Sequence, residues 1–73
     1  MQRQVGQQIR IHVNGEAVET SAATLAELVA AQGFAETAVA TALNGDFVPR
    51  QARAKARLAA DDTVEIVAPR QGG

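Results

Sequence analysis

The sequence predicts a small α+β fold in which a mixed sheet of four to five strands is covered by one main helix. Segments with the apolar–polar alternation of half-buried strands lie near both ends of the chain. Asn-Gly pairs, the strongest short signal for a β-hairpin, follow two of the apolar segments. Between those pairs, one segment repeats its apolar residues at i, i+3 and i+4, as an amphipathic helix does.

Composition limits the range of functions. The chain has 73 residues, enough for one domain, and its 3% of aromatic residues leaves a core of Ile, Leu and Val. It has no cysteine, which excludes a disulfide framework, a thiolate metal site and a thiol nucleophile, and is consistent with a cytoplasmic location. A net charge of −1 argues against nucleic-acid binding. We expect no membrane span, because no apolar run approaches about 20 residues, and no signal peptide, because residues 1–8 are polar.

The first half of the chain predicts a hairpin and a helix. Residues 9–13 alternate with their apolar side chains toward the core, and residues 16–20 return after the Asn-Gly pair. Thr24 and Glu27 have the spacing of a capping box, and Gly33 is a plausible helix stop. The predicted helix covers residues 25–32 and is too short to be stable without packing on the sheet.

The second half predicts the remaining strands. Residues 38–43 are apolar on both faces, so alternation does not reveal the buried side. Phe47-Val48 is a short strand ended by Pro49, which cannot donate to a ladder. Residues 50–58 fit either a turn or a brief helical segment anchored by Leu58, and residues 63–68 form the last strand.

Alternation on that last strand places Val64 and Ile66 inward and Glu65 and Val67 outward. The resulting order, β-β-α-β-(β)-β, is that of the β-grasp architecture, in which one helix crosses a mixed sheet. We therefore expect a polar, flexible lead-in at residues 1–8, a β-grasp domain at 9–68 and a flexible arm at 69–73.

The arm carries the strongest functional signal. A free carboxylate after Gly72-Gly73 would be an ionised oxygen nucleophile on a segment thin enough for a narrow channel. Five extended residues reach about 16–18 Å, which would let the arm enter the active site of another protein. The alternative is an inert, frayed end.

Three segments give the chain its resemblance to a known family. They are the opening strand with Asn14-Gly15, residues 43–50 (LNGDFVPR), and residues 64–67 followed by the Gln-Gly-Gly ending. In this order and spacing they resemble the ThiS family, the small ubiquitin-like sulfur carriers of thiamine biosynthesis. One departure is Ala60-Asp61-Asp62, where the family usually has Asp-Gly-Asp, although Asp61 can adopt the left-handed geometry of glycine.

The resemblance implies a carrier that is not itself an enzyme and that binds no cofactor or metal. An adenylating enzyme related to ubiquitin E1 would use ATP and Mg²⁺ to activate Gly73. A persulfide donor would then convert Gly73 to a thiocarboxylate, and thiazole synthase would take the sulfur for the thiazole ring of thiamine. Gly72 would give a thin approach, and Gln71 and Arg70 would contact the channel mouth.

Partner docking is predicted on the sheet face opposite the helix, through Val67, Phe47 and Leu43, and we expect a monomer. The alternative is that these residues are core or scattered surface apolar side chains. Other functions stay open: a sulfur carrier for another pathway such as molybdopterin synthesis, a ubiquitin-like protein modifier, or a binding module. The Val48-Pro49-Arg50 stretch favours thiamine.

The remaining polar residues are interpreted as surface groups. His12 is the only histidine and has no metal-ligand partners at a suitable spacing, so we expect it on the outer face of the first strand. A solvated face is favoured over an anion or partner contact for the basic stretch. That stretch consists of Arg50, Arg53, Lys55 and Arg57.

Overall fold

The structure, a computed structural model, describes residues 7–68. It begins with the predicted hairpin, in which β1 (Ile9–Val13) pairs antiparallel with β2 (Glu16–Thr20). Asn14 and Gly15 both have left-handed backbone angles, with φ of 51° and 87°, which a two-residue type I′ turn requires.

The helix α1 (Leu25–Ala31) forms where it was predicted, one residue shorter at its end. The Oγ1 atom of Thr24 accepts a hydrogen bond from the Glu27 backbone N–H at 3.2 Å. The Glu27 carboxylate accepts from the N–H of Ala23 at 2.7 Å, one residue before the N-cap residue Thr24, whose N–H a standard capping box would use. The cap is therefore reciprocal, and Gly33, with φ of 87°, follows the helix in the left-handed conformation.

The second half contains three strands and a short 3₁₀ helix. β3 (Ala40–Leu43) and β4 (Asp46–Val48) form a second hairpin, and η1 (Arg50–Lys55) follows Pro49. β5 (Thr63–Val67) is the last strand. The predicted elements are confirmed, and the ambiguous segment is a 3₁₀ helix followed by a buried Leu58.

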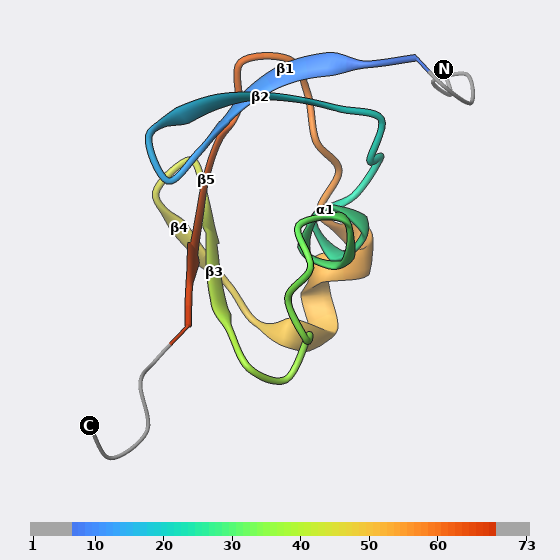
Figure 1. Cartoon of the computed structure of the whole chain (residues 1–73). Coiled ribbons are helices and arrows are strands. Elements are labelled where there is room, and N and C mark those ends of the chain that lie inside the picture. The colour runs from blue at the N-terminus through green and yellow to red at the C-terminus, as the bar shows by residue number, and fades with distance from the viewer. Residues whose placement is uncertain (1–6, 69–73) are drawn as a thin grey trace.

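The strands form one five-stranded sheet in the order β2-β1-β5-β3-β4. β5, the last strand in sequence, therefore lies in the middle of the sheet. It pairs parallel with β1 and antiparallel with β3, which makes the sheet mixed as predicted. Figure 1 shows the sheet curling around α1 and η1, which contact each other inside the curl.

The core fills the space between the sheet and α1. Ile11 and Val13 of β1 are buried as predicted, whereas Ile9, at the start of the strand, is only partly buried. The helix contributes its predicted stripe and β5 contributes Val64 and Ile66, so the alternation on β5 is confirmed. The buried apolar residues are Ile11, Val13, Ala22, Leu25, Leu28, Val29, Leu58, Val64 and Ile66.

Strand register settles which side of β3 faces the core. Thr41 pairs with Ile66 and Leu43 pairs with Val64, so both lie on the core-facing side. Thr41 is only 2% exposed and donates its hydroxyl hydrogen to the carbonyl of Val48 at 2.9 Å. The alternate residues of β3 lie on the outer side.

One interpretation of the basic stretch is wrong. Arg53 is not part of a solvated face, because it is only 3% exposed. Its guanidinium donates to Thr41 Oγ1 at 3.0 Å and to the backbone carbonyls of Glu36 and Val39 at 2.8 and 2.7 Å. From η1, the Arg53 side chain reaches Thr41 on the core-facing side of β3. The Ala- and Arg-rich composition of the segment does not distinguish this buried arginine from its exposed neighbours.

The predicted left-handed turn residue is confirmed. Asp61 has φ of 71°, and its backbone N–H donates to the carbonyl of Arg10 at 2.7 Å. Asp62 closes the same turn through its carboxylate, which accepts from the N–H of Ala59 at 2.8 Å. Within residues 7–68, no helix is long and apolar enough to cross a membrane.

Candidate functional site

The residues predicted to carry the chemistry, Gly73 with Gly72, Gln71 and Arg70, lie outside the described part of the chain. The structure does describe the strand from which they continue. The candidate site is therefore the end of β5 together with the sheet face and the pocket beside it.

Asn14 holds the final part of β5. β1 and β5 pair as far as Val13 and Val64, after which β1 turns away. Asn14 continues this pairing: its N–H donates to Val64 O at 2.9 Å, and its side-chain amide bonds to both backbone groups of Ile66. The two side-chain bonds measure 3.1 Å (Nδ2 to the carbonyl) and 2.9 Å (the Ile66 N–H to Oδ1). The Asn14 side-chain amide takes the place of the next residue of β1, so hydrogen bonding to β5 extends two residues beyond Val64, to Ile66.

Asn44 holds the beginning of β5 in a similar way. Its N–H donates to the carbonyl of Thr63 at 2.7 Å, and its Oδ1 accepts from the N–H of Thr63 at 2.9 Å. Its Nδ2 donates to the carboxylate of Asp62 at 3.0 Å. We call Asn14 and Asn44, with these bonds, the two asparagine clasps.

Both asparagines were expected only as turn residues, so their side-chain bonds to β5 were not predicted. Aspartate or glycine would also suit the first position of such a turn. Of these three residues, only asparagine has a side chain with both a hydrogen-bond donor and an acceptor at neutral pH. The presence of asparagine at both turns was therefore the one sequence signal that could have indicated these side-chain bonds.

The outer face of the sheet beside the end of β5 carries four apolar side chains, next to the exposed carboxylate of Glu65, which pairs with Ala42. Val67 and Phe47 are 57% and 70% exposed, the two large apolar side chains most open to solvent in the described chain. Val67 pairs with Ala40, and Phe47 pairs with Ala42, so the four side chains share this face. We call Ala40, Ala42, Phe47 and Val67 the outer patch.

Leu43, the third predicted docking residue, is not in the outer patch. Its register with Val64 places it on the core-facing side, where it is partly buried against the core. His12 lies on the outer side of β1 as expected and is half-buried. Among residues 7–68, no three His, Asp or Glu side chains gather as they would around a metal ion.

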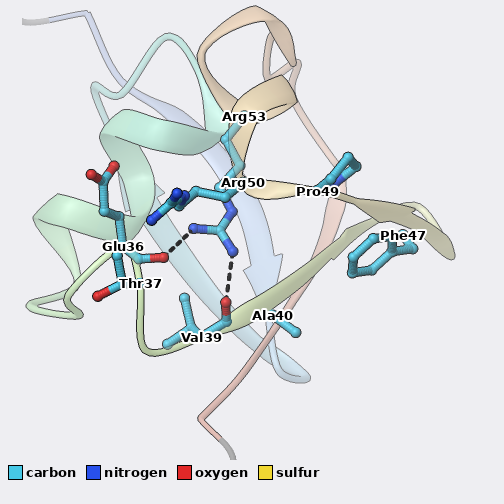
Figure 2. Close-up of a pocket in the computed structure, with 8 residues that line it drawn as sticks. All are labelled: Glu36, Thr37, Val39, Ala40, Phe47, Pro49, Arg50 and Arg53. Carbon is cyan, nitrogen blue, oxygen red and sulfur yellow. Dashed lines mark hydrogen bonds between the residues drawn. The ribbon is translucent and has the colours of Figure 1, made fainter.

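A pocket of about 250 Å³ adjoins the outer patch. It lies between the start of β3, the end of β4 and the start of η1, and Ala40 and Phe47 belong to both the pocket and the patch. Figure 2 shows Phe47 and Pro49 on one side of it and Glu36 and Thr37 on the other. The complete lining is Glu36, Thr37, Val39, Ala40, Phe47, Pro49, Arg50 and Arg53.

Comparison with known proteins identifies the family. The model of the ThiS family matches residues 5–73, nearly the whole chain. The chain belongs to the ThiS family. A search of curated proteins gave no match. Membership in the ThiS family supports a role as a small sulfur carrier in thiamine biosynthesis, with enzymes as its partners.

Solved structures agree with this family. A crystal structure of a thiamine biosynthesis protein (ThiS) from Geobacter metallireducens is 28% identical and superposes with a TM-score of 0.74. That match covers 89% of this chain and 100% of the other. An NMR solution structure of a thiamine biosynthesis protein from the same organism, also 28% identical, gives a TM-score of 0.73 and covers 89% and 88% of the two chains. The ThiS β-grasp fold predicted from the sequence is confirmed.

The Asn14 clasp predicts a local effect of substitution. Asn14→Gly keeps the left-handed turn but removes both side-chain bonds to Ile66, which we expect to cost about 1–3 kcal/mol of unfolding free energy. Amide hydrogen exchange should speed up at Ile66. The matched variant Asn44→Gly should instead speed up exchange at Thr63. Unchanged exchange at Ile66 in Asn14→Gly would show that the clasp does not hold β5.

Proposed function

We propose that this protein carries sulfur as a C-terminal thiocarboxylate on Gly73 and delivers it for the thiazole ring of thiamine. The observation that carries the proposal is the family match, which extends from residue 5 through the arm to residue 73. The fold supports it, because the central strand β5 continues directly into that arm.

Activation by adenylation explains why such a carrier needs a partner enzyme. A carboxylate is a poor electrophile, and its oxygen is not displaced by sulfur at neutral pH. An E1-like enzyme would bind ATP and Mg²⁺, and the Gly73 carboxylate oxygen would attack the α-phosphorus while pyrophosphate leaves. The resulting mixed anhydride has an electrophilic acyl carbon and AMP as its leaving group.

Sulfur would then enter from a persulfide on a donor protein. The terminal persulfide sulfur attacks the acyl carbon, AMP departs, and an acyl disulfide joins the carrier to the donor. A second thiol cleaves the sulfur–sulfur bond, which leaves a disulfide on the donor side and the thiocarboxylate on Gly73. Thiazole synthase would take the sulfur from this group.

The carrier supplies geometry in this scheme and no catalytic side chain. The clasped strand β5 gives the arm a fixed starting point, and Gly72 lets the backbone enter a narrow channel. Arg70 and Gln71 would contact the mouth of that channel. Accurate delivery of a reacting atom depends on such positioning.

We propose the outer patch as the surface on which these enzymes dock. Its two exposed apolar side chains, Phe47 and Val67, lie next to the point where β5 ends, so an enzyme bound there would be close to the start of the arm. Buried aromatic and aliphatic anchors dominate binding energy at protein interfaces, and Phe47 and Val67 fit that role. Leu43 is left out because it packs against the core.

The thiocarboxylate is testable by intact mass. After incubation with ATP, Mg²⁺, the E1-like enzyme and a persulfide donor, the chain should gain the mass difference between sulfur and oxygen, localised to Gly73. Deletion of Gly73 should abolish the gain without changing the urea unfolding curve. Removal of residues 1–4, which lie outside the family match, should leave the gain intact. An undiminished gain in the Gly73 deletion would contradict the assignment.

Docking on the outer patch is testable by affinity. Phe47→Ala and Val67→Ala should each raise the Kd for the adenylating enzyme at least about tenfold, because each removes an exposed apolar anchor. Their unfolding free energies should change by less than about 1 kcal/mol. Ala30→Ser, on the exposed side of α1, is the control and should bind normally. Normal binding by both patch variants would place the docking surface elsewhere.

A further inference from the structure

The pocket beside the outer patch contains an arginine whose charge is buried. Arg53 is 3% exposed, and its guanidinium is held by a hydroxyl oxygen and two backbone carbonyls, all of them uncharged. Figure 2 shows its bonds to Glu36 and Val39 at the pocket wall. An arginine stays protonated in proteins, so the pocket wall carries a full positive charge.

A second arginine lines the same pocket from the start of η1. Arg50 is exposed, in contrast to Arg53, and is therefore accessible to another molecule. Within residues 7–68, the ion pair present joins Arg10 to Glu19, so neither pocket arginine is paired with a carboxylate.

The charges of the pocket do not balance. Glu36 is its one acidic lining residue, against the two arginines, which leaves a net positive charge. Because one of these cations is shielded from water, its field is screened less than that of an ordinary surface arginine. An anionic group of suitable size would therefore be attracted to the pocket.

The size and walls of the pocket indicate what kind of anion would fit. Its volume of about 250 Å³ lies below the range of about 300–1,000 Å³ typical of small-molecule sites. Val39, Ala40, Phe47 and Pro49 form apolar walls that would pack against the methylene groups of an amino-acid side chain. These features suit a single acidic side chain better than a nucleotide or another small metabolite.

We infer that the pocket accepts an Asp or Glu side chain of an enzyme that takes the arm, with Arg50 as the pairing group; this rests on the proposed function. Continuity supports a partner protein as the source of the carboxylate. Since Ala40 and Phe47 line both the pocket and the outer patch, an enzyme docked on the patch would place its neighbouring residues at the pocket. Arg50 would therefore select among partner proteins, because the partner must present an apolar surface with an Asp or Glu beside it.

Charge reversal tests this assignment against a matched control. Arg50→Glu should raise the Kd for the E1-like enzyme or for thiazole synthase by about tenfold or more, equivalent to about 1.4 kcal/mol. Arg57→Glu changes the net charge equally at an exposed site outside the pocket and should alter Kd less than about threefold. The excess effect at Arg50 should shrink at high salt. Thermal unfolding of both variants checks that the fold is retained.

A second comparison separates the partner's carboxylate from the chain's own terminal carboxylate, which has the same chemistry. Arg50→Glu and Arg57→Glu are compared again in chains lacking Gly72-Gly73. If the Arg50 effect persists there, the partner supplies the acid; if it disappears, the arm is the occupant and the inference is overturned. Equal Kd values for the two variants also overturn it, provided that wild-type conversion to the thiocarboxylate is intact. A wild-type chain that neither binds nor is converted would overturn the proposed function as well.

Discussion

The structure depends on the position of β5 in the middle of the sheet. The last strand in sequence lies between β1 and β3, so the fold closes only when β5 inserts. The side chains of Val64 and Ile66 are buried in the core, and Asn14 and Asn44 each bond to the backbone of this strand. The segment that supports the arm is therefore also the segment that completes the core, which couples folding to function.

This arrangement fixes the arm's starting point while leaving one face free. The Ile66 side chain is buried on the core-facing side, and the Ile66 backbone bonds to the Asn14 amide. On the opposite side, Val67 and Phe47 are exposed, and the pocket with Arg50 opens next to them. Because alternation along a strand places successive side chains on opposite faces, neighbouring residues of β5 can serve stability and recognition separately. A partner bound to the outer patch and the pocket would lie beside the strand from which the arm continues.

Most of the fold could be predicted from local patterns, because hairpin turns, capping residues and alternation act over a few neighbours. Thr24 and Glu27 marked the start of α1, and the alternation around Ile66 gave the buried face of β5. Long-range register could not be predicted in this way. Leu43 was assigned to the docking face because its strand is apolar on both sides, and only pairing with Val64 shows that it faces the core. For the same reason, Arg53 was wrongly predicted to lie on a solvated face, and Asn14 was predicted only as a turn residue. The hydrogen-bond partners of both side chains are distant in sequence.

The fate of labelled sulfur would show whether this chain carries sulfur to the thiazole of thiamine. The chain would be loaded with isotopically labelled sulfur and incubated separately with thiazole synthase and its other substrates, and with the large subunit of molybdopterin synthase and its substrate. We predict that the label moves into the thiazole product and that the carrier returns to its unloaded mass. Transfer to the molybdopterin precursor, with the label retained in the presence of thiazole synthase, would show that this chain does not supply the thiazole sulfur.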